Sequence, residues 1–173
     1  MKVHIAVNVK TQQIVALEVT REYIHDGTRL EGLVEESSRR VDVKGVIGDG
    51  AYDSRRNFNL LDERGIEPII RVRRNAVKRL RGCPAKRKAL IMQRENPDVW
   101  KCKYGLRWIA ESAFLWLKRA FGEYVTTKNL KNMIQEITLK VFLYNLFIGM
   151  TRITQEREEQ QRQNRRHHKK IMQ

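Results

Sequence analysis

The chain has 173 residues, of which 41% are hydrophobic and 8% aromatic, enough to form the core of one domain with a tail and to exclude wholesale disorder. It carries 35 lysines and arginines against 20 acidic residues, and the net charge of +15 favours a polyanionic partner, most simply nucleic acid. No run approaches the ~18–20 apolar residues of a membrane helix, and residues 1–15 alternate polar and apolar side chains, so we expect neither a membrane span nor a signal peptide.

The first forty residues have the pattern of a hairpin followed by a helix. Apolar side chains alternate with polar ones over residues 3–9, a polar turn is expected at 10–13, and a second strand at 14–20. After a break at residues 25–27, apolar residues recur at helical spacing to about residue 40.

A short apolar strand over residues 43–50 then ends at an acidic residue, Asp49, that lies between two glycines. Ser54 is a suitable N-cap for a helix that Gly65 would end. A further short strand is expected at residues 67–70. This mixed order of strands and helices after an initial hairpin predicts an α/β fold, a mixed sheet covered by helices.

The second half is helical and basic. Residues 71–88 hold nine basic residues and no acidic one, with glycine and proline interruptions, and predict a basic loop or insertion that extends to about residue 103. Helical periodicity returns over residues 104–121 and again over 130–153. The second helix is apolar on most faces between residues 137 and 150 and is expected to be buried. The polar, basic residues 154–173 are expected to form either a helix extension or a disordered tail.

Two cysteines occur, Cys83 and Cys102, and neither has a second cysteine or a histidine at the spacing of a zinc site. We therefore expect two reduced thiols and neither a disulfide framework nor structural zinc. Such cysteine usage is typical of a cytoplasmic protein.

The helix expected at 104–121 has one face of reactive side chains. At ~100° per residue, four of them fall within a sector of about 60°, opposite a broad apolar face: Tyr104, Arg107, Glu111 and Lys118. Glu111 could bind a divalent metal, and its basic and aromatic neighbours could hold phosphate oxygens. A surface helix of no special function has the same pattern, with Arg107 and Glu111 as an ordinary i,i+4 ion pair.

Asp49 is the second candidate, because α/β sheets place ligand groups at the carboxyl ends of their strands. The glycines beside it would let a metal ion or a nucleic-acid backbone approach closely, although a simple turn also uses glycine and aspartate. Asp49 and Glu111 are compatible with one Mg²⁺ site. Two ions for an in-line displacement at phosphorus usually need more than two carboxylates.

Three segments resemble the DDE transposases of bacterial and archaeal insertion sequences. They are Gly-Asp-Gly-Ala-Tyr-Asp-Ser at residues 48–54, Gly-Ile-Glu-Pro-Ile-Ile at residues 65–70, and Arg-Arg-Asn-Ala at residues 73–76. The opening hairpin and the His-Asp pair at residues 25–26 are also similar to the family. The resemblance covers the chain to about residue 153.

The reactive helix face adds a signature with fixed spacing. Tyr104-x2-Arg107-x3-Glu111-x6-Lys118 resembles the Y-R-E-K signature of the insertion sequences related to the Tn5 element. The residues after it, Lys118-Arg119-x-Phe121-Gly122, are also similar.

The resemblance implies an RNase H-like catalytic domain over residues 1–153. Asp49 would be the second acidic residue of the catalytic triad and Glu111 the third, and both would bind Mg²⁺, or Mn²⁺. The remaining signature residues would contact phosphates of the element's ends: Tyr104, Arg107 and Lys118. Such enzymes cut DNA by attack of water and join the freed 3′-hydroxyl to target DNA. The implied partners are double-stranded DNA, at inverted-repeat ends and target, and a second copy in a dimer, in a cytoplasmic, nucleoid-associated protein.

The chain departs from the family pattern at its start. The first catalytic aspartate and its strand should precede the opening hairpin, and Asp26, Asp42 and Asp53 come too late to replace it. We therefore expect an N-terminally truncated transposase that lacks the first strand of its sheet, is inactive alone and binds Mg²⁺ only if the missing aspartate is supplied. The alternatives are a non-catalytic DNA-binding remnant that interferes with an intact transposase, and an unrelated nuclease or regulator on the same fold.

Several other side chains are candidates for contact with DNA, and solvated surface is the alternative for each basic group. Trp108 lies nearest the reactive face and is the best-placed tryptophan, whereas packing is expected for at least two of Trp100, Trp108 and Trp116. The basic candidates lie in the tail, at residues 165–170, and in the basic segment: Arg71, Arg73 and Arg74.

Overall fold

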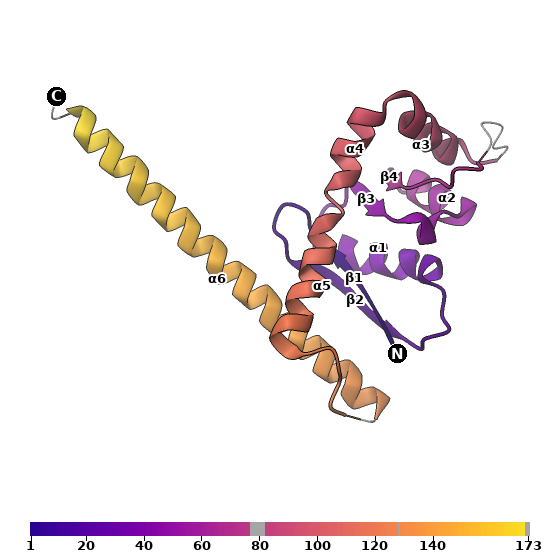
Figure 1. The fold of residues 1–173 in the computed structure, drawn as a ribbon, viewed down its shortest axis with the longest axis horizontal. Coiled ribbons are helices and arrows are strands. Elements are labelled where there is room, and N and C mark those ends of the chain that lie inside the picture. Colours follow the sequence, from indigo (N-terminus) through magenta and orange to yellow (C-terminus); the bar gives the residue numbers. More distant parts are fainter. Residues whose placement is uncertain (77–81, 128, 172–173) are drawn as a thin grey trace.

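A computed structural model describes residues 1–76, 82–127 and 129–171, with side chains described to residue 163. The fold is mixed α/β. Figure 1 shows a body of short strands and helices from which one long helix, α6 (Leu130–Ile171), extends. The helical alternative for residues 154–171 is therefore the one that the structure contains.

The predicted hairpin is confirmed. Strands β1 (Lys2–Val7) and β2 (Ile14–Thr20) pair antiparallel, with Ile5 opposite Leu17. The side chain of Asn8 stabilises the turn, because its Oδ1 accepts hydrogen bonds from the backbone N–H groups of residues 10 and 11 at 2.9 and 3.2 Å.

A parallel strand pair follows a short helical segment. The turn η1 (Asp26–Arg29) leads into α1 (Leu30–Ser38). Strand β3 (Gly45–Gly48), the turn η2 (Gly50–Tyr52), helix α2 (Arg55–Glu63) and strand β4 (Glu67–Ile70) then form a crossover unit in which β3 and β4 are parallel.

The predicted ends of α2 are confirmed. The Oγ of Ser54 accepts a hydrogen bond from the backbone N–H of Asn57 at 3.2 Å, as an N-cap does. Gly65 has a positive φ of 66°, which glycine adopts without steric cost after a helix.

The expected single mixed sheet is not what the described residues form. Their strands make two separate two-stranded sheets, β1–β2 and β3–β4. Within each pair the two strands hydrogen-bond to each other, and α1 joins the two sheets by side-chain packing. The buried Leu30 and Val34 of α1 reach the cluster formed by Phe58 and Leu61 of α2.

The basic loop expected at residues 71–88 is wrong in its last part, because α3 (Pro84–Glu95) begins inside it. Proline is favourable at the first position of a helix, where its missing N–H has no partner to lose. Ala85, Ala89 and Leu90 are buried against the core while the basic side chains cover the rest of the helix. The neighbouring Cys83 is buried and Cys102 exposed, and both thiols are free.

The helix expected over 104–121 is two helices, α4 (Pro97–Gly105) and α5 (Trp108–Phe121). At the break, the N–H groups of Leu106 and Arg107 donate to carbonyls three residues earlier, which tightens the chain. Gly105 is a weak helix former and favours the interruption. A uniform 100° step therefore does not relate Tyr104 on α4 to the residues of α5.

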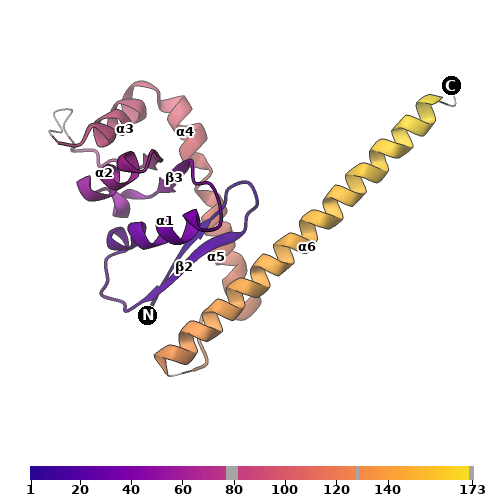
Figure 2. The ribbon, with the colours of Figure 1, turned by 180° about the vertical axis from the view of Figure 1, so that it is seen from behind.

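The expectation that residues 137–150 are buried is wrong for half of the helix. The buried residues of α6 are Ile137, Val141 and Tyr144, which face β2 and α5. Asn145 fixes this face, because its amide accepts from the N–H of Ile14 and donates to the carbonyl of Ile14, both at 2.8 Å. The opposite side is partly exposed, at Leu139, Leu143 and Leu146, and Figure 2 shows that the C-terminal half of α6 extends away from the body.

By length and composition alone, residues Leu130–Gln163 of α6 would suffice to cross a membrane, which the sequence pattern did not lead us to expect. The mean hydropathy of the most apolar stretch is 1.2, and 17% of that stretch is buried. Helices that pack inside a protein core pass the same test. Most of the apolar surface of α6 is therefore uncovered by the described residues.

Candidate functional site

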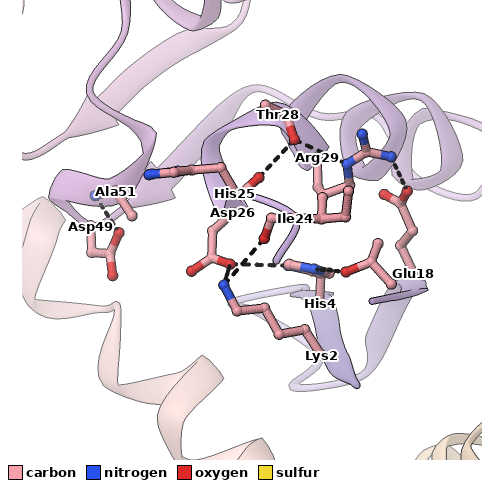
Figure 3. A network of polar contacts seen from close by, with 11 residues as sticks. Lys2, His4, Glu18, Ile24, His25, Asp26, Thr28, Arg29, Asp49 and Ala51 are labelled. Carbon is pink, nitrogen blue, oxygen red and sulfur yellow. Dashed lines mark hydrogen bonds and ion pairs between the residues drawn. The ribbon is translucent and has the colours of Figure 1, made fainter. Parts of the chain in front are cut away.

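Asp49 directly follows β3 and lies at the carboxyl ends of the two parallel strands. Its Oδ1 accepts a hydrogen bond from the backbone N–H of Ala51 at 2.8 Å, which orients the carboxylate and starts the η2 turn (Figure 3). The side chain is exposed and makes no ion pair with the described residues. Asp49 thus presents an oriented charge to solvent.

The glycines beside Asp49 have different roles. A Cβ on Gly48 would lie 3.2 Å from Cδ2 of Tyr52, so packing favours glycine there. At Gly50 a Cβ would meet only the carbonyl oxygen of Arg71, at 3.8 Å. The backbone N–H of Arg71 donates to the carbonyl of Gly48 at 3.2 Å, so the basic segment after β4 runs beside Asp49.

The turns η1 and η2 are held against each other. The Nδ2 of the buried Asn57 donates to the carbonyl oxygens of Gly27 at 2.9 Å and Tyr52 at 3.0 Å. A Cβ on Gly27 would lie 2.7 Å from the carbonyl oxygen of Ala51, so only glycine permits this approach. Asp26, which begins η1, is thereby placed on the same side as Asp49.

Asp26 is the centre of a polar network drawn in Figure 3. Its Oδ1 accepts a hydrogen bond from Nζ of Lys2 at 3.0 Å and lies 3.8 Å from Nδ1 of His4. The Nε2 of His4 is 2.9 Å from Oγ1 of Thr20. Figure 3 shows Asp26 between this network and Asp49, so the two carboxylates border one region of the surface.

Two pKa shifts describe the electrostatics of this region. Burial, reinforced by the negative charges of Asp26 and Asp49, raises the pKa of Tyr52 to about 12, so its hydroxyl stays protonated. Burial lowers the pKa of His4, against the opposing effect of Asp26 and Glu18. The neutral imidazole is therefore the favoured form of His4 in the folded protein at neutral pH.

The basic segment after β4 is held by its backbone and exposes its guanidinium groups. The backbone N–H of Arg73 donates to Oδ2 of Asp53 at 3.1 Å, and the side chain of Asp53 is buried beside Nζ of Lys86 at 2.6 Å. Arg94 donates to the carbonyl of Arg74 at 3.1 Å. The side chains of the predicted DNA contacts are exposed on this segment: Arg71, Arg73 and Arg74. Nε of Arg73 lies 3.9 Å from Oδ2 of Asp53.

The structure links three of the four signature residues. Arg107 forms an ion pair with Glu111 at 2.7 Å and lies over the ring of Tyr104, with its guanidinium carbon 5.7 Å from the ring centre. Trp100 stacks on Tyr104, with the two ring centres 4.3 Å apart. Lys118 is not part of it and pairs instead with Glu123 at 3.3 Å.

The tryptophans divide as the sequence suggested. Trp116 packs in the second core, with ring centres 5.2 Å from both Tyr144 and Phe147. Trp108 is 54% exposed at the start of α5 and stays the best-placed candidate for a nucleic-acid contact.

Among the described residues, the donor set at Asp49 is incomplete for a divalent metal ion. Carboxylate oxygens suit Mg²⁺, and Asp49 has one oxygen free of described partners. Among residues 1–76, 82–127 and 129–163, however, no group of three histidine, cysteine or acidic side chains is arranged to hold an ion. Asp49 and Glu111 therefore have suitable chemistry without forming a complete site.

Three contributions to this region were not predicted from the sequence: the Asn57 clamp, the network of Asp26 with Lys2 and His4, and the Asp53–Lys86 pair. Each depends on residues more than twenty positions apart or on a buried amide, which local patterns do not reveal. The sequence signal that could have indicated the contact between η1 and η2 is Gly27, which lies where the two turns meet.

The protein is a mixed α/β domain with an oriented carboxylate at the ends of two parallel strands and exposed arginines on the segment that follows. Together with the net charge of +15, this arrangement suits a polyanionic substrate. Comparison with known families gives a match to the transposase DDE domain over residues 1–146. The chain belongs to this family, whose transposases act on DNA and generally use divalent metal ions. No solved structure matches the chain.

Proposed function

We propose that this chain is the catalytic region of a DNA transposase of the group related to the Tn5 element, with an RNase H-like fold over residues 1–153. The observation that carries the proposal is Asp49, an oriented, exposed carboxylate at the strand ends beside the arginine segment. The match to the transposase DDE domain supports phosphoryl transfer on DNA strands as the reaction class. Residues 154–173 form a basic extension in this proposal, and the protein acts in the cytoplasm, on the nucleoid.

Asp49 and Glu111 are the carboxylates that we assign to the reaction. They would hold Mg²⁺ or Mn²⁺ together with a third oxygen donor, and the ion would activate the attacking hydroxyl and stabilise the leaving oxygen. The hydrogen bond from Ala51 keeps Asp49 oriented before DNA arrives. Asp26 lies on the same side of the fold, where the ammonium of Lys2 compensates its charge.

The basic and aromatic residues bind the DNA backbone in this proposal. Without DNA, Arg107 pairs with Glu111 and lies over the ring of Tyr104. A DNA phosphate would replace Glu111 as the partner of Arg107 and so free the carboxylate. Lys118 would exchange Glu123 for a phosphate in the same way. The exposed Trp108 and the arginines beside Asp49 extend the contact surface: Arg71, Arg73 and Arg74.

A second function is supported by the incomplete donor group. If no third donor joins Asp49 and Glu111, the same basic surface makes a DNA-binding protein that does not cut DNA. Such a protein would occupy the ends used by an intact transposase and interfere with it. The two functions share DNA binding and differ in strand cleavage.

Cleavage of labelled duplex DNA distinguishes them. The substrate carries the genomic sequence that borders the gene on either side, incubated with Mg²⁺ or Mn²⁺ and analysed on denaturing gels. The catalytic function predicts nicking that Asp49→Asn and Glu111→Gln each reduce by at least about 100-fold. Asp42→Asn is the matched control, because Asp42 is an exposed aspartate on the approach to β3 whose ion pair with Lys44 lies outside the site.

Binding without cleavage by the wild-type chain would favour the non-catalytic function. Cleavage that persists in both site variants would exclude the assigned carboxylates. Absence of DNA binding at low salt would contradict both functions.

A further inference from the structure

The segment that follows β4, residues 71–76, continues the alternating burial of that strand, and we call it the arginine loop. Ile70 and Val72 are 0% and 1% exposed and belong to the core cluster around α2. Arg71 and Arg73 alternate with them and are exposed. Side chains two positions apart lie on one face of an extended backbone, about 6.6 Å apart along it. The loop therefore anchors one face in the core and carries arginines on the other.

Gln93 of α3 binds the start of the arginine loop through both polar backbone groups of one residue. Its Oε1 accepts a hydrogen bond from the N–H of Val72 at 3.0 Å, and its Nε2 donates to the carbonyl of Val72 at 3.3 Å. A residue on a neighbouring antiparallel strand satisfies the same two groups. The preceding residue is held by β3, because the N–H of Arg71 donates to the carbonyl of Gly48 at 3.2 Å. The start of the loop is thus fixed between β3 and α3.

Arg94, the next residue of α3, fixes the end of the arginine loop. Its guanidinium donates to the carbonyls of Arg74 and Ala76, at 3.1 and 2.8 Å. The N–H of Ala76 donates to the carbonyl of Arg73 at 3.1 Å, which closes a turn. The guanidinium of Arg94 is therefore occupied by the backbone of the loop.

The guanidinium groups of the loop itself are differently placed. Within residues 1–76, 82–127 and 129–163, the side chains of Arg71 and Arg74 make no hydrogen bond or ion pair. The side chain of Arg73 is 70% exposed. A guanidinium binds phosphate through two parallel N–H groups, which these side chains have available. The loop thus combines a backbone held by the protein with cationic groups that face solvent.

We propose that Gln93 and Arg94 are positioning residues for DNA, which hold the arginine loop in the shape in which its guanidinium groups bind phosphates of the DNA backbone. A loop that is already ordered loses little conformational entropy when DNA binds, so its contacts are tighter than those of the same arginines on a mobile loop. The inference rests on the proposed function, because it takes DNA as the partner. It goes further by assigning part of the DNA affinity to two side chains that bind the protein's own backbone.

Gln93→Met tests the inference without changing the net charge. Methionine is an unbranched side chain that cannot replace the two hydrogen bonds to Val72. We expect the affinity for a short labelled DNA duplex, measured by fluorescence anisotropy, to fall about tenfold. Gln135→Met is the matched control, because Gln135 is an exposed glutamine of α6, outside the loop and α3. Its affinity for the duplex should equal that of the wild type.

A double-mutant cycle separates positioning from a general loss of structure. In an Arg71→Gln/Arg73→Gln background the loop has lost two of the groups that it positions, so the effect of Gln93→Met should shrink to about twofold or less. Damage to the rest of the protein would reduce the affinity equally in both backgrounds. Amide hydrogen exchange reports on the loop directly, and the N–H of Val72 is expected to exchange faster in Gln93→Met.

Arg94→Gln gives a second test that does not depend on how Gln93→Met folds. Arg87→Gln removes the same charge from an exposed position of the same helix. Because Arg94 binds the backbone of the loop and Arg87 does not, we expect Arg94→Gln to lower the affinity for the duplex at least about threefold more than Arg87→Gln.

The inference is overturned if Gln93→Met binds the duplex like the wild type, or if its loss is the same in both backgrounds. Equal affinities of Arg94→Gln and Arg87→Gln would also overturn it. In these cases the proposed function stands, since the wild type still binds DNA. A folded wild type that does not bind the duplex at low salt would instead contradict the proposed function, and with it the inference.

Discussion

Asn57 joins the two turns that carry Asp26 and Asp49, and it does so with one buried nitrogen. The residue is 3% exposed, and its Nδ2 donates to the carbonyls of Gly27 and Tyr52. Asn57→Ala leaves both carbonyls without this donor, so we expect the free energy of unfolding to fall by about 2 kcal/mol. Urea denaturation followed by circular dichroism measures the change.

The control for this prediction lies on the same helix. Asn59 donates to the carbonyl of Gly82 at 3.3 Å from a partly exposed position. Asn59→Ala should therefore cost less than about 0.5 kcal/mol. Equal losses for the two variants would mean that the clamp between η1 and η2 adds nothing beyond an ordinary surface contact.

His4 gives the fold a pH dependence of known sign. Its folded pKa is lowered by burial, so the folded state binds a proton less readily than the unfolded state. The contribution of His4 to stability is fully present above its unfolded pKa of about 6.5 and is lost as the pH falls through the folded pKa. We expect unfolding midpoints in urea to decrease from pH 7 to pH 5.5, and to decrease less in His4→Gln. An equal decrease in both proteins would assign the effect to other groups.

At the scale of elements, local chemistry predicts α2 and misses α3. Ser54 and Gly65 identify both ends of α2, because capping depends on residues adjacent in sequence. Pro84 has two opposite meanings, a helix breaker or the first residue of a helix. Only the burial of Ala89 and Leu90 against the core decides between them, and burial is a tertiary property.

The candidate site was predictable to a similar degree. Asp49 and the Arg107–Glu111 pair follow from spacing, since a strand end and an i,i+4 step are local features. The break at Gly105, which separates Tyr104 from the frame of α5, does not follow from periodicity. The contacts of Asp26 could not be inferred either, because they join the two ends of the hairpin region across the fold.

The buried pair of Asp53 and Lys86 connects the site to α3. Their side chains are 1% and 12% exposed, with Nζ and Oδ1 2.6 Å apart. Asp53→Asn leaves the ammonium without its counter-charge, and we expect a loss of about 3 kcal/mol in the free energy of unfolding by urea. Asp62→Asn, at an exposed position of α2, should change stability by less than about 0.5 kcal/mol.

The double variant Asp53→Asn/Lys86→Met tests the cause of that loss. Removing both charges leaves no unpaired ion, so the double variant should be more stable than Asp53→Asn alone. A double variant as unstable as the sum of its parts would show that the two side chains act separately.

At the scale of the molecule, α6 shows where periodicity stops being informative. The sequence correctly predicts a helix that is apolar on most faces, and it does not indicate whether one chain supplies the cover for all of them. Here Tyr144 packs against the body, while Leu143 and Leu146 on the other side of α6 are partly exposed. Apolar periodicity therefore predicts the helix without predicting which of its faces the same chain covers.

The net charge of +15 predicts DNA binding whose affinity falls steeply with salt, because each phosphate contact releases counterions. The position of each arginine should determine how much that residue contributes to the salt dependence of DNA affinity. Arg71→Gln/Arg73→Gln removes two guanidinium groups from the segment that runs beside Asp49, whereas Arg39→Gln/Arg40→Gln removes two that pair with Glu36 on α1. Both variants lose the same net charge, so a difference between them isolates location.

We expect the first variant to reduce the slope of log affinity against log salt by ~2, at ~0.9 for each lost phosphate contact, and the second to leave it nearly unchanged. Fluorescence anisotropy of a short labelled duplex, titrated at several salt concentrations, gives the slope. Equal reductions would show that DNA senses only the total charge of the chain. A loss confined to the arginines beside Asp49 would place the DNA backbone next to the carboxylate, which is the arrangement that strand cleavage at this site requires.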